Sequence, residues 1–142
     1  KLADFRGRWR LTRRIDDARA GVVGRLDGQA LFTVEAQGLV LTETGLLRYG
    51  DGPPMRAERR YLWRAEGRGI AVLFDDGRPF HWFSGAATKA AHDCPPDLYR
   101  VRYDFSDWPD WRTIWHVTGP RKAYEMVSHY APDARDSTQV YE

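Results

Sequence analysis

The sequence contains few features that would place it in a membrane or an oxidising compartment. Its single cysteine, Cys94, cannot form an intrachain disulfide, which fits a reducing cytosol, so we expect a cytoplasmic protein. No apolar run approaches the ~20 residues of a membrane-spanning helix, and no signal-peptide core follows Lys1, so no membrane association is expected. Because the chain starts with Lys rather than Met, the question whether a targeting segment precedes it stays open.

Several patterns that carry chemistry are also missing. The net charge is +2, and 22 basic residues are spread among 20 acidic ones, so we expect no nucleic-acid partner. The glycines occupy turns rather than a phosphate-binding loop, and no catalytic triad or oxyanion-hole pattern is present. We expect no metal site, since only His81 and His92 converge and Cys94 lies in a turn.

What the sequence has instead is a repeated two-residue alternation of apolar and polar residues between short turns. At 142 residues, with 42% hydrophobic and 13% aromatic residues, we expect a single domain over residues 1–142 with one sizeable core. Strand-like segments recur about every 8–12 residues, which is typical of sandwiches and barrels, and no window shows a helical stripe. The ten expected strands are 8–15, 24–36, 39–49, 55–65, 70–75, 79–84, 87–93, 98–105, 111–118 and 121–130.

The alternation keeps one face through every turn, and this predicts an all-β, up-and-down antiparallel barrel with a lined interior. Centring each turn sets Val72 opposite His81, and His92 opposite Tyr99. The face rich in Trp, Phe, Val and Leu is expected to be the inner one. Four apolar residues fall outside by this count, where they form a homodimer interface or indicate local bulges: Leu62, Leu73, Phe80 and Trp82.

The same count predicts further pairs across the strands. It sets His81 opposite Ala90, Glu43 opposite both Tyr61 and Phe32, Arg59 opposite Gly45, Tyr103 opposite Thr113, and Trp115 opposite Tyr124.

The segment Phe5-Arg6-Gly7-Arg8-Trp9 resembles the Gly-x-Trp signature that opens the first strand of lipocalins and related calycin barrels, including the fatty-acid-binding and nitrobindin-like branches. The resemblance implies that Trp9 is a buried plug at one end of the barrel and that Arg121 covers it. The stretches 5–15, 55–63, 75–81, 92–99 and 119–122 more closely resemble an uncharacterised bacterial family, domain of unknown function 6314, over nearly the whole chain. That likeness implies a calycin-type barrel and transfers no activity.

Two polar clusters are expected inside the barrel. His81 and His92 are predicted to be diagonal neighbours beside Tyr99, where they bind a ligand or move a proton. The alternative is that both are core residues whose hydrogen bonds are made within the protein. Arg13, Glu43 and Arg59 form the second cluster, either as a closed Glu43–Arg59 pair or as a surplus of positive charge that binds an anion.

The leading hypothesis is that the interior binds a small, partly aromatic, anionic molecule. The alternative is an enzyme in the same cavity, with proton-transfer chemistry and four candidate catalytic groups: His92, His81, Glu43 and Tyr99. No cofactor is expected, although the nitrobindin-like resemblance implies haem binding through His81 or His92 as a second alternative. The predicted ligand-binding residues are Arg13, Glu43, Arg59, Tyr61, Trp63, His81, His92, Tyr99, Tyr103, Trp115 and Tyr124.

Overall fold

The protein, as a computed structural model, is described here over residues 1–133, and these residues form ten β-strands and one short 3₁₀ helix. All ten strands lie within a few residues of their predicted positions. The prediction of one domain over residues 1–142 stays a prediction, because 134–142 lie outside the described residues. In chain order the elements are η1 (Leu2–Phe5), β1 (Gly7–Asp17), β2 (Val22–Glu35), β3 (Gly38–Tyr49), β4 (Met55–Glu66), β5 (Gly69–Phe74), β6 (Pro79–Phe83), β7 (Lys89–Cys94), β8 (Asp97–Asp104), β9 (Trp111–Thr118) and β10 (Ala123–Pro132).

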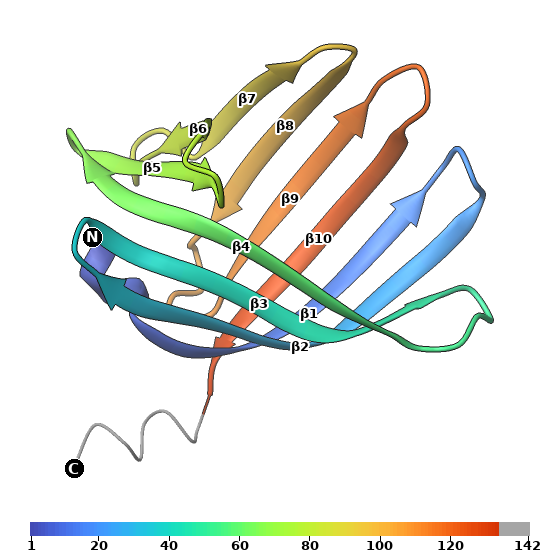
Figure 1. The fold of residues 1–142 in the computed structure, drawn as a ribbon, viewed down its shortest axis with the longest axis horizontal. Helices are drawn as coiled ribbons and strands as arrows, with labels where there is room; N and C mark the ends of the chain where they lie inside the picture. The colour runs from blue at the N-terminus through green and yellow to red at the C-terminus, as the bar shows by residue number, and fades with distance from the viewer. Residues whose placement is uncertain (134–142) are drawn as a thin grey trace.

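The strands form a single antiparallel sheet that curls into a nearly closed barrel (Figure 1). Their order is β6-β5-β4-β3-β2-β1-β10-β9-β8-β7, so the first and last strands of the chain pair with each other. The two edges of the sheet, β6 and β7, follow each other in sequence but share no ladder. The expected pairing of His81 with Ala90 is therefore wrong, and a seam separates β6 from β7.

The predicted inner face is confirmed by burial. Residues of β1 from Trp9 to Ile15 alternate between buried and exposed, and the inner positions of β9 and those of β10 from Met126 to Tyr130 are buried as well. The pairs Val72–His81, His92–Tyr99 and Tyr103–Thr113 are as predicted. Other pairs are shifted by two residues, which keeps the face: Glu43 lies opposite Ala30 and Arg59, Tyr61 opposite Leu41, and Trp115 opposite Met126.

Phe80 is the apolar residue whose predicted face is wrong. The β5–β6 register shifts between Val72, which pairs with His81, and Leu73, which pairs with Pro79, so β6 carries one extra residue there. Such a bulge bends the strand and redirects a side chain. Phe80 is 3% exposed and belongs to the core, whereas Trp82 on the same strand is 38% exposed on the outside.

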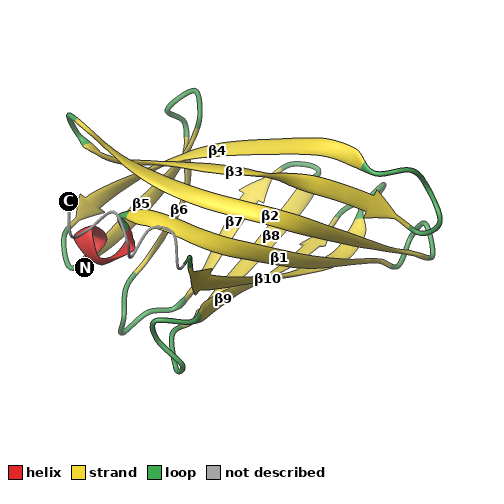
Figure 2. Cartoon of the chain, turned by 90° about the horizontal axis from the view of Figure 1, so that it is seen from below, coloured by secondary structure: helices red, strands yellow, loops and turns green. Residues whose placement is uncertain are grey.

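One end of the barrel is filled with aromatic rings. Helix η1 lies across this end (Figure 2), and Phe5 packs against Trp63, Trp108 and Trp111 at ring-centroid distances of 5.1, 5.3 and 5.2 Å. Trp9 is 5% exposed, and its indole N–H donates to the Phe5 carbonyl at 2.8 Å. The prediction of a buried Trp9 is confirmed. Arg121 does not cover it, because Arg121 precedes β10 whereas Trp9 pairs with Pro132, where β10 ends.

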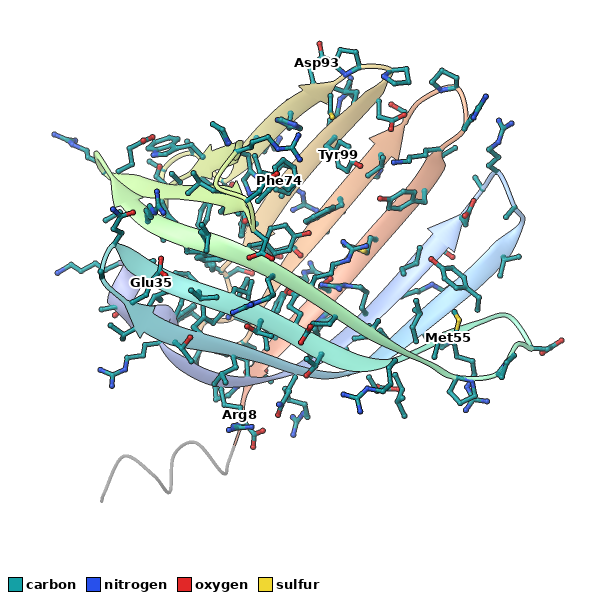
Figure 3. All side chains as sticks on the ribbon, viewed as in Figure 1. Arg8, Glu35, Met55, Phe74, Asp93 and Tyr99 are labelled. Carbon is teal, nitrogen blue, oxygen red and sulfur yellow. The ribbon has the colours of Figure 1, made fainter. Side chains whose placement is uncertain are left out.

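The other end of the barrel is open to solvent at several inner-face positions. Tyr49 and Met55 are 37% and 50% exposed although both occupy inner positions of β3 and β4. Met55 lies at one side of this end and Tyr99 at another (Figure 3). Within residues 1–133, no helix has the length and apolarity needed to cross a membrane.

Candidate functional site

Arg13 and Glu43 form a closed ion pair in the middle of the barrel. The Arg13 Nη2 donates to Glu43 Oε1 at 2.8 Å, and both side chains are 5% exposed. Arg13 Nε donates to Ser128 Oγ at 2.7 Å, and the Tyr130 hydroxyl donates to the second carboxylate oxygen of Glu43. Burial opposes the charge on Arg13, but Glu43 and Tyr130 outweigh it and raise the pKa of the guanidinium. The pair is thus satisfied within the protein.

The partners of Glu43 differ from those expected. Arg59 lies directly opposite Glu43 across the β3–β4 ladder, yet it is Arg13, from β1, that reaches the carboxylate. Ser128 and Tyr130 complete the site, and the sequence analysis did not select them. Their signal was available, because both share the parity of the predicted inner residue Met126 on β10.

His81 pairs with Tyr103 rather than with His92. The His81 Nε2 and the Tyr103 hydroxyl are 2.7 Å apart, and Tyr103 stacks on Phe83 with centroids 3.8 Å apart. Burial, together with a smaller effect of His92, lowers the pKa of His81 from 6.5 to about 3. The imidazole is therefore neutral near pH 7. Burial also raises the pKa of the Tyr103 phenol well above its ordinary value.

Phe80 divides the interior into two levels. Its ring packs against His81 at 4.4 Å on one side, and against His92, Tyr99 and Trp115 at 5.3, 5.8 and 5.3 Å on the other. Below it lies a central cavity of only about 20 Å³. The cavity is lined by Arg13, Leu41, Glu43, Tyr61, Trp63, Val72, Phe80, His81, Tyr103, Trp111, Thr113, Trp115 and Tyr130.

Above Phe80, a second group of inner-face residues is more exposed than the centre of the barrel, except for Trp115, which is buried. Arg59 is exposed, and its guanidinium carbon lies 5.8 Å from the centroid of the Trp115 ring. Lys122 contacts the Tyr99 ring at 5.9 Å and forms an ion pair with Asp97 at 3.1 Å. We call this group the open-end cluster: Arg59, Tyr61, His92, Tyr99, Trp115, Lys122 and Tyr124.

The phenols of the open-end cluster lie within electrostatic range of its cations. Burial raises the pKa of Tyr61, and Arg59 partly opposes that increase. Burial and the neighbouring Tyr99 raise the pKa of Tyr124, and Arg59 and Lys122 oppose it. At neutral pH these hydroxyls are therefore protonated, and each can donate a hydrogen bond to an acceptor at the open end.

The eleven predicted ligand-binding residues thus separate by depth and not into the two clusters that the sequence suggested. Arg13 and Glu43 are enclosed with His81, Tyr103 and Trp63 around the central cavity. Arg59, Tyr61, His92, Tyr99, Trp115 and Tyr124 all belong to the open-end cluster, although Tyr61 and Trp115 also line the central cavity. Lys122 was not predicted, although the expected strand 121–130 includes it with the parity of Tyr124 and Met126; in the structure it immediately precedes β10.

The geometry limits the chemistry of the candidate catalytic groups. Glu43 is held by Arg13 and Tyr130, and His81 Nε2 is held by Tyr103, so neither side chain reaches the open end with a free carboxylate or a free Nε2. His92 and Tyr99 face the open end, with ring centroids 6.2 Å apart. A haem does not fit at His81, because a cavity of about 20 Å³ holds little more than one water molecule.

Comparison with solved structures gives a match in fold. The S-type phycobiliprotein lyase CPES from Guillardia theta superposes with a TM-score of 0.62 at 10% sequence identity, covering 93% of this chain and 90% of the lyase chain. At that identity the likeness concerns the barrel alone. No curated protein matches the chain. A family profile matches residues 5–132, and the chain therefore belongs to the family described as a family of unknown function, DUF6314.

Proposed function

We propose that this protein binds a small, partly aromatic, anionic molecule at the open-end cluster. The observation that carries the proposal is Arg59, an exposed guanidinium on the inner face of a barrel, beside the Trp115 ring. Among the described residues no carboxylate pairs with Arg59, since the one opposite it, Glu43, is occupied by Arg13. A planar guanidinium of this kind suits a carboxylate or a phosphate.

The surrounding side chains supply the rest of such a site. Tyr99, Trp115 and Tyr124 present ring faces and edges to the same space, and these favour a ligand with a flat apolar part. The hydroxyls of Tyr61, Tyr99 and Tyr124 supply hydrogen-bond donors. Lys122 contributes less positive charge than Arg59, because Asp97 already neutralises it in part.

A second candidate function is catalysis at the same cluster. His92 and Tyr99 are the candidate catalytic groups left facing the open end, and they lie opposite each other on β7 and β8. In that case His92 moves a proton while Tyr99 or Arg59 stabilises a developing oxyanion. Binding and catalysis differ in whether a captured compound is recovered unchanged. Native mass spectrometry of protein from its own host, followed by incubation of the identified compound, separates them.

Binding itself is tested with anilinonaphthalene sulfonate, an aromatic anion whose fluorescence rises in apolar sites. We expect the native protein to bind it, and Arg59→Met to weaken binding by about tenfold or more, since a hydrogen bond to a charged group contributes about 1.5–3 kcal/mol. Arg60→Met is the matched control, because Arg60 follows Arg59 on β4 and faces outward. Equal affinities in the two variants would contradict the proposal.

A further inference from the structure

Three of the residues that line the centre of the barrel carry a buried polar atom without a partner. Four buried side-chain nitrogen atoms of the described residues have no hydrogen-bond partner in the protein. Three of them, Trp63 Nε1, His81 Nδ1 and Trp111 Nε1, belong to residues that line the central cavity. A buried donor or acceptor left without a partner costs about 1–3 kcal/mol, and such groups are rare in native proteins. Three around one space indicate that something occupies it.

The size of the cavity selects the occupant. Its volume of about 20 Å³ exceeds the roughly 10–15 Å³ that one water molecule needs, and it is too small for an organic ligand. A site with three polar partners also meets the usual two to four hydrogen bonds of an internal water.

The charges around the cavity do not favour an ion. Arg13 and Glu43 both line the cavity, and because they pair with each other they leave no net charge there to attract an anion or a cation. A cation would need oxygen or nitrogen lone pairs, which the indole N–H groups of Trp63 and Trp111 do not offer. An uncharged molecule with both donor and acceptor capacity meets all three nitrogen atoms.

We infer that the central cavity is a binding site for one water molecule, which accepts hydrogen bonds from the indole N–H groups of Trp63 and Trp111 and donates one to His81 Nδ1. This arrangement assigns the tautomer of His81. The proton of the neutral imidazole lies on Nε2, and Nε2–H donates to the Tyr103 oxygen at 2.7 Å. The water thus joins β4, β6 and β9 at the centre of the molecule.

A high-resolution crystal structure of the full chain tests the site, and imidazole ¹⁵N NMR of the same protein tests the tautomer. We expect one density peak within hydrogen-bond distance of both indole nitrogen atoms and of His81 Nδ1, and a protonated Nε2 with an unprotonated Nδ1. A central cavity without density, or a proton on Nδ1, would overturn the inference.

A conservative variant tests which donors hold the water. Trp111→Phe keeps an aromatic ring and removes one donor, and we expect it to shorten the residence time of the water in magnetic relaxation dispersion by about tenfold. Trp9→Phe is the control, because the Trp9 indole donates to the Phe5 carbonyl and does not line the cavity. Equal residence times in the two variants would show that Trp111 does not hold the water.

Discussion

Two inward-facing arginines have opposite surroundings, and they have different roles. Arg13 is 7% exposed and bonded to Glu43 and Ser128, whereas Arg59 is exposed and lies against the Trp115 ring. A buried ion pair adds little stability compared with an apolar pair of similar volume. Removing one member is costly, because it leaves the other charge buried without a partner. We therefore expect Arg13 to stabilise the barrel, whereas Arg59 is the arginine that we propose for ligand binding.

Arg13→Met should lower the free energy of unfolding by about 3–5 kcal/mol, because it leaves the Glu43 carboxylate buried without its cation. Adding Glu43→Leu should recover most of that loss. Urea unfolding of the two single variants and the double variant measures this. Arg59→Met is the control and should change stability by less than about 1 kcal/mol. A similar loss in Arg13→Met and Arg59→Met would contradict the division of roles.

The lowered pKa of His81 gives stability a pH dependence of definite sign. Below about pH 6.5 the unfolded chain protonates His81, while the folded protein stays neutral there until about pH 3. The contribution of neutral His81 to the free energy of unfolding is complete above pH 6.5. It is lost as the pH falls toward 3, by up to about 1.4 kcal/mol per pH unit. Unfolding free energies of the native protein and His81→Gln across this range measure it. His81→Gln should show the flatter profile; parallel profiles would refute the assignment.

Parity along the strands predicts which side chains point inward, but not which of them meet. Arg13, Glu43 and Arg59 were correctly placed inside. Their pairing depends on the depth of each residue in the barrel, and a two-residue change in the β3–β4 register alters that depth without changing the face. For this reason the sequence identified the candidate residues of the site and misjudged which arginine is enclosed.

At the scale of single elements, the bulge in β6 has the largest effect on the interior. It turns Phe80 inward, between the open-end cluster and His81, while its neighbour but one, Trp82, stays on the outer face. The sequence signalled a bulge or an interface through the apolar Phe80 at an outer position, but it did not decide between them, because the Asp76-Gly77 turn is compatible with either register. A regular β6 would place Phe80 outside and leave the two levels of the interior connected.

Phe80→Ala should therefore lower the free energy of unfolding by about 3–5 kcal/mol, as truncation of a buried aromatic residue does. Trp82→Ala is the matched control on the same strand. It should cost less than about 1.5 kcal/mol, since it removes an exposed ring and one hydrogen bond, from Trp82 Nε1 to the Glu66 carbonyl. Chemical denaturation compares them, and a larger loss in Trp82→Ala would mean that β6 has no bulge.

At the scale of the whole molecule, the chain order and the turns were enough to predict ten antiparallel strands and one inner face. The closure was harder to predict. The sheet closes by pairing β1 with β10, over nine residue pairs from Trp9–Pro132 to Asp17–Tyr124, and it leaves β6 and β7 apart. Local turn geometry cannot report this choice, because it depends on how the complete sheet twists. The expected homodimer at Leu62, Leu73 and Trp82 stays a prediction.

The aromatic end should be the more important of the two ends for stability. Trp9→Ala is expected to cost about 3–5 kcal/mol, because it removes a buried indole and a hydrogen bond to Phe5. Trp108→Ala at the same end is the comparison, and its 42% exposed ring should cost clearly less. Thermal unfolding of both variants checks the order, and the reverse order would show that Trp9 does not seal the barrel.

The seam between β6 and β7 is the place in the described sheet where widening the barrel would cost least. Parting any other neighbouring strands breaks a ladder of backbone hydrogen bonds, whereas β6 and β7 are tied by backbone hydrogen bonds only at the loop between them, where Ser84 and Ala87 bond each other. The β1–β2 hairpin lies opposite the seam, with four strands on each side of it. If the ligand that we propose needs a wider interior, separation of β6 from β7 about that hairpin is the movement that preserves every strand ladder.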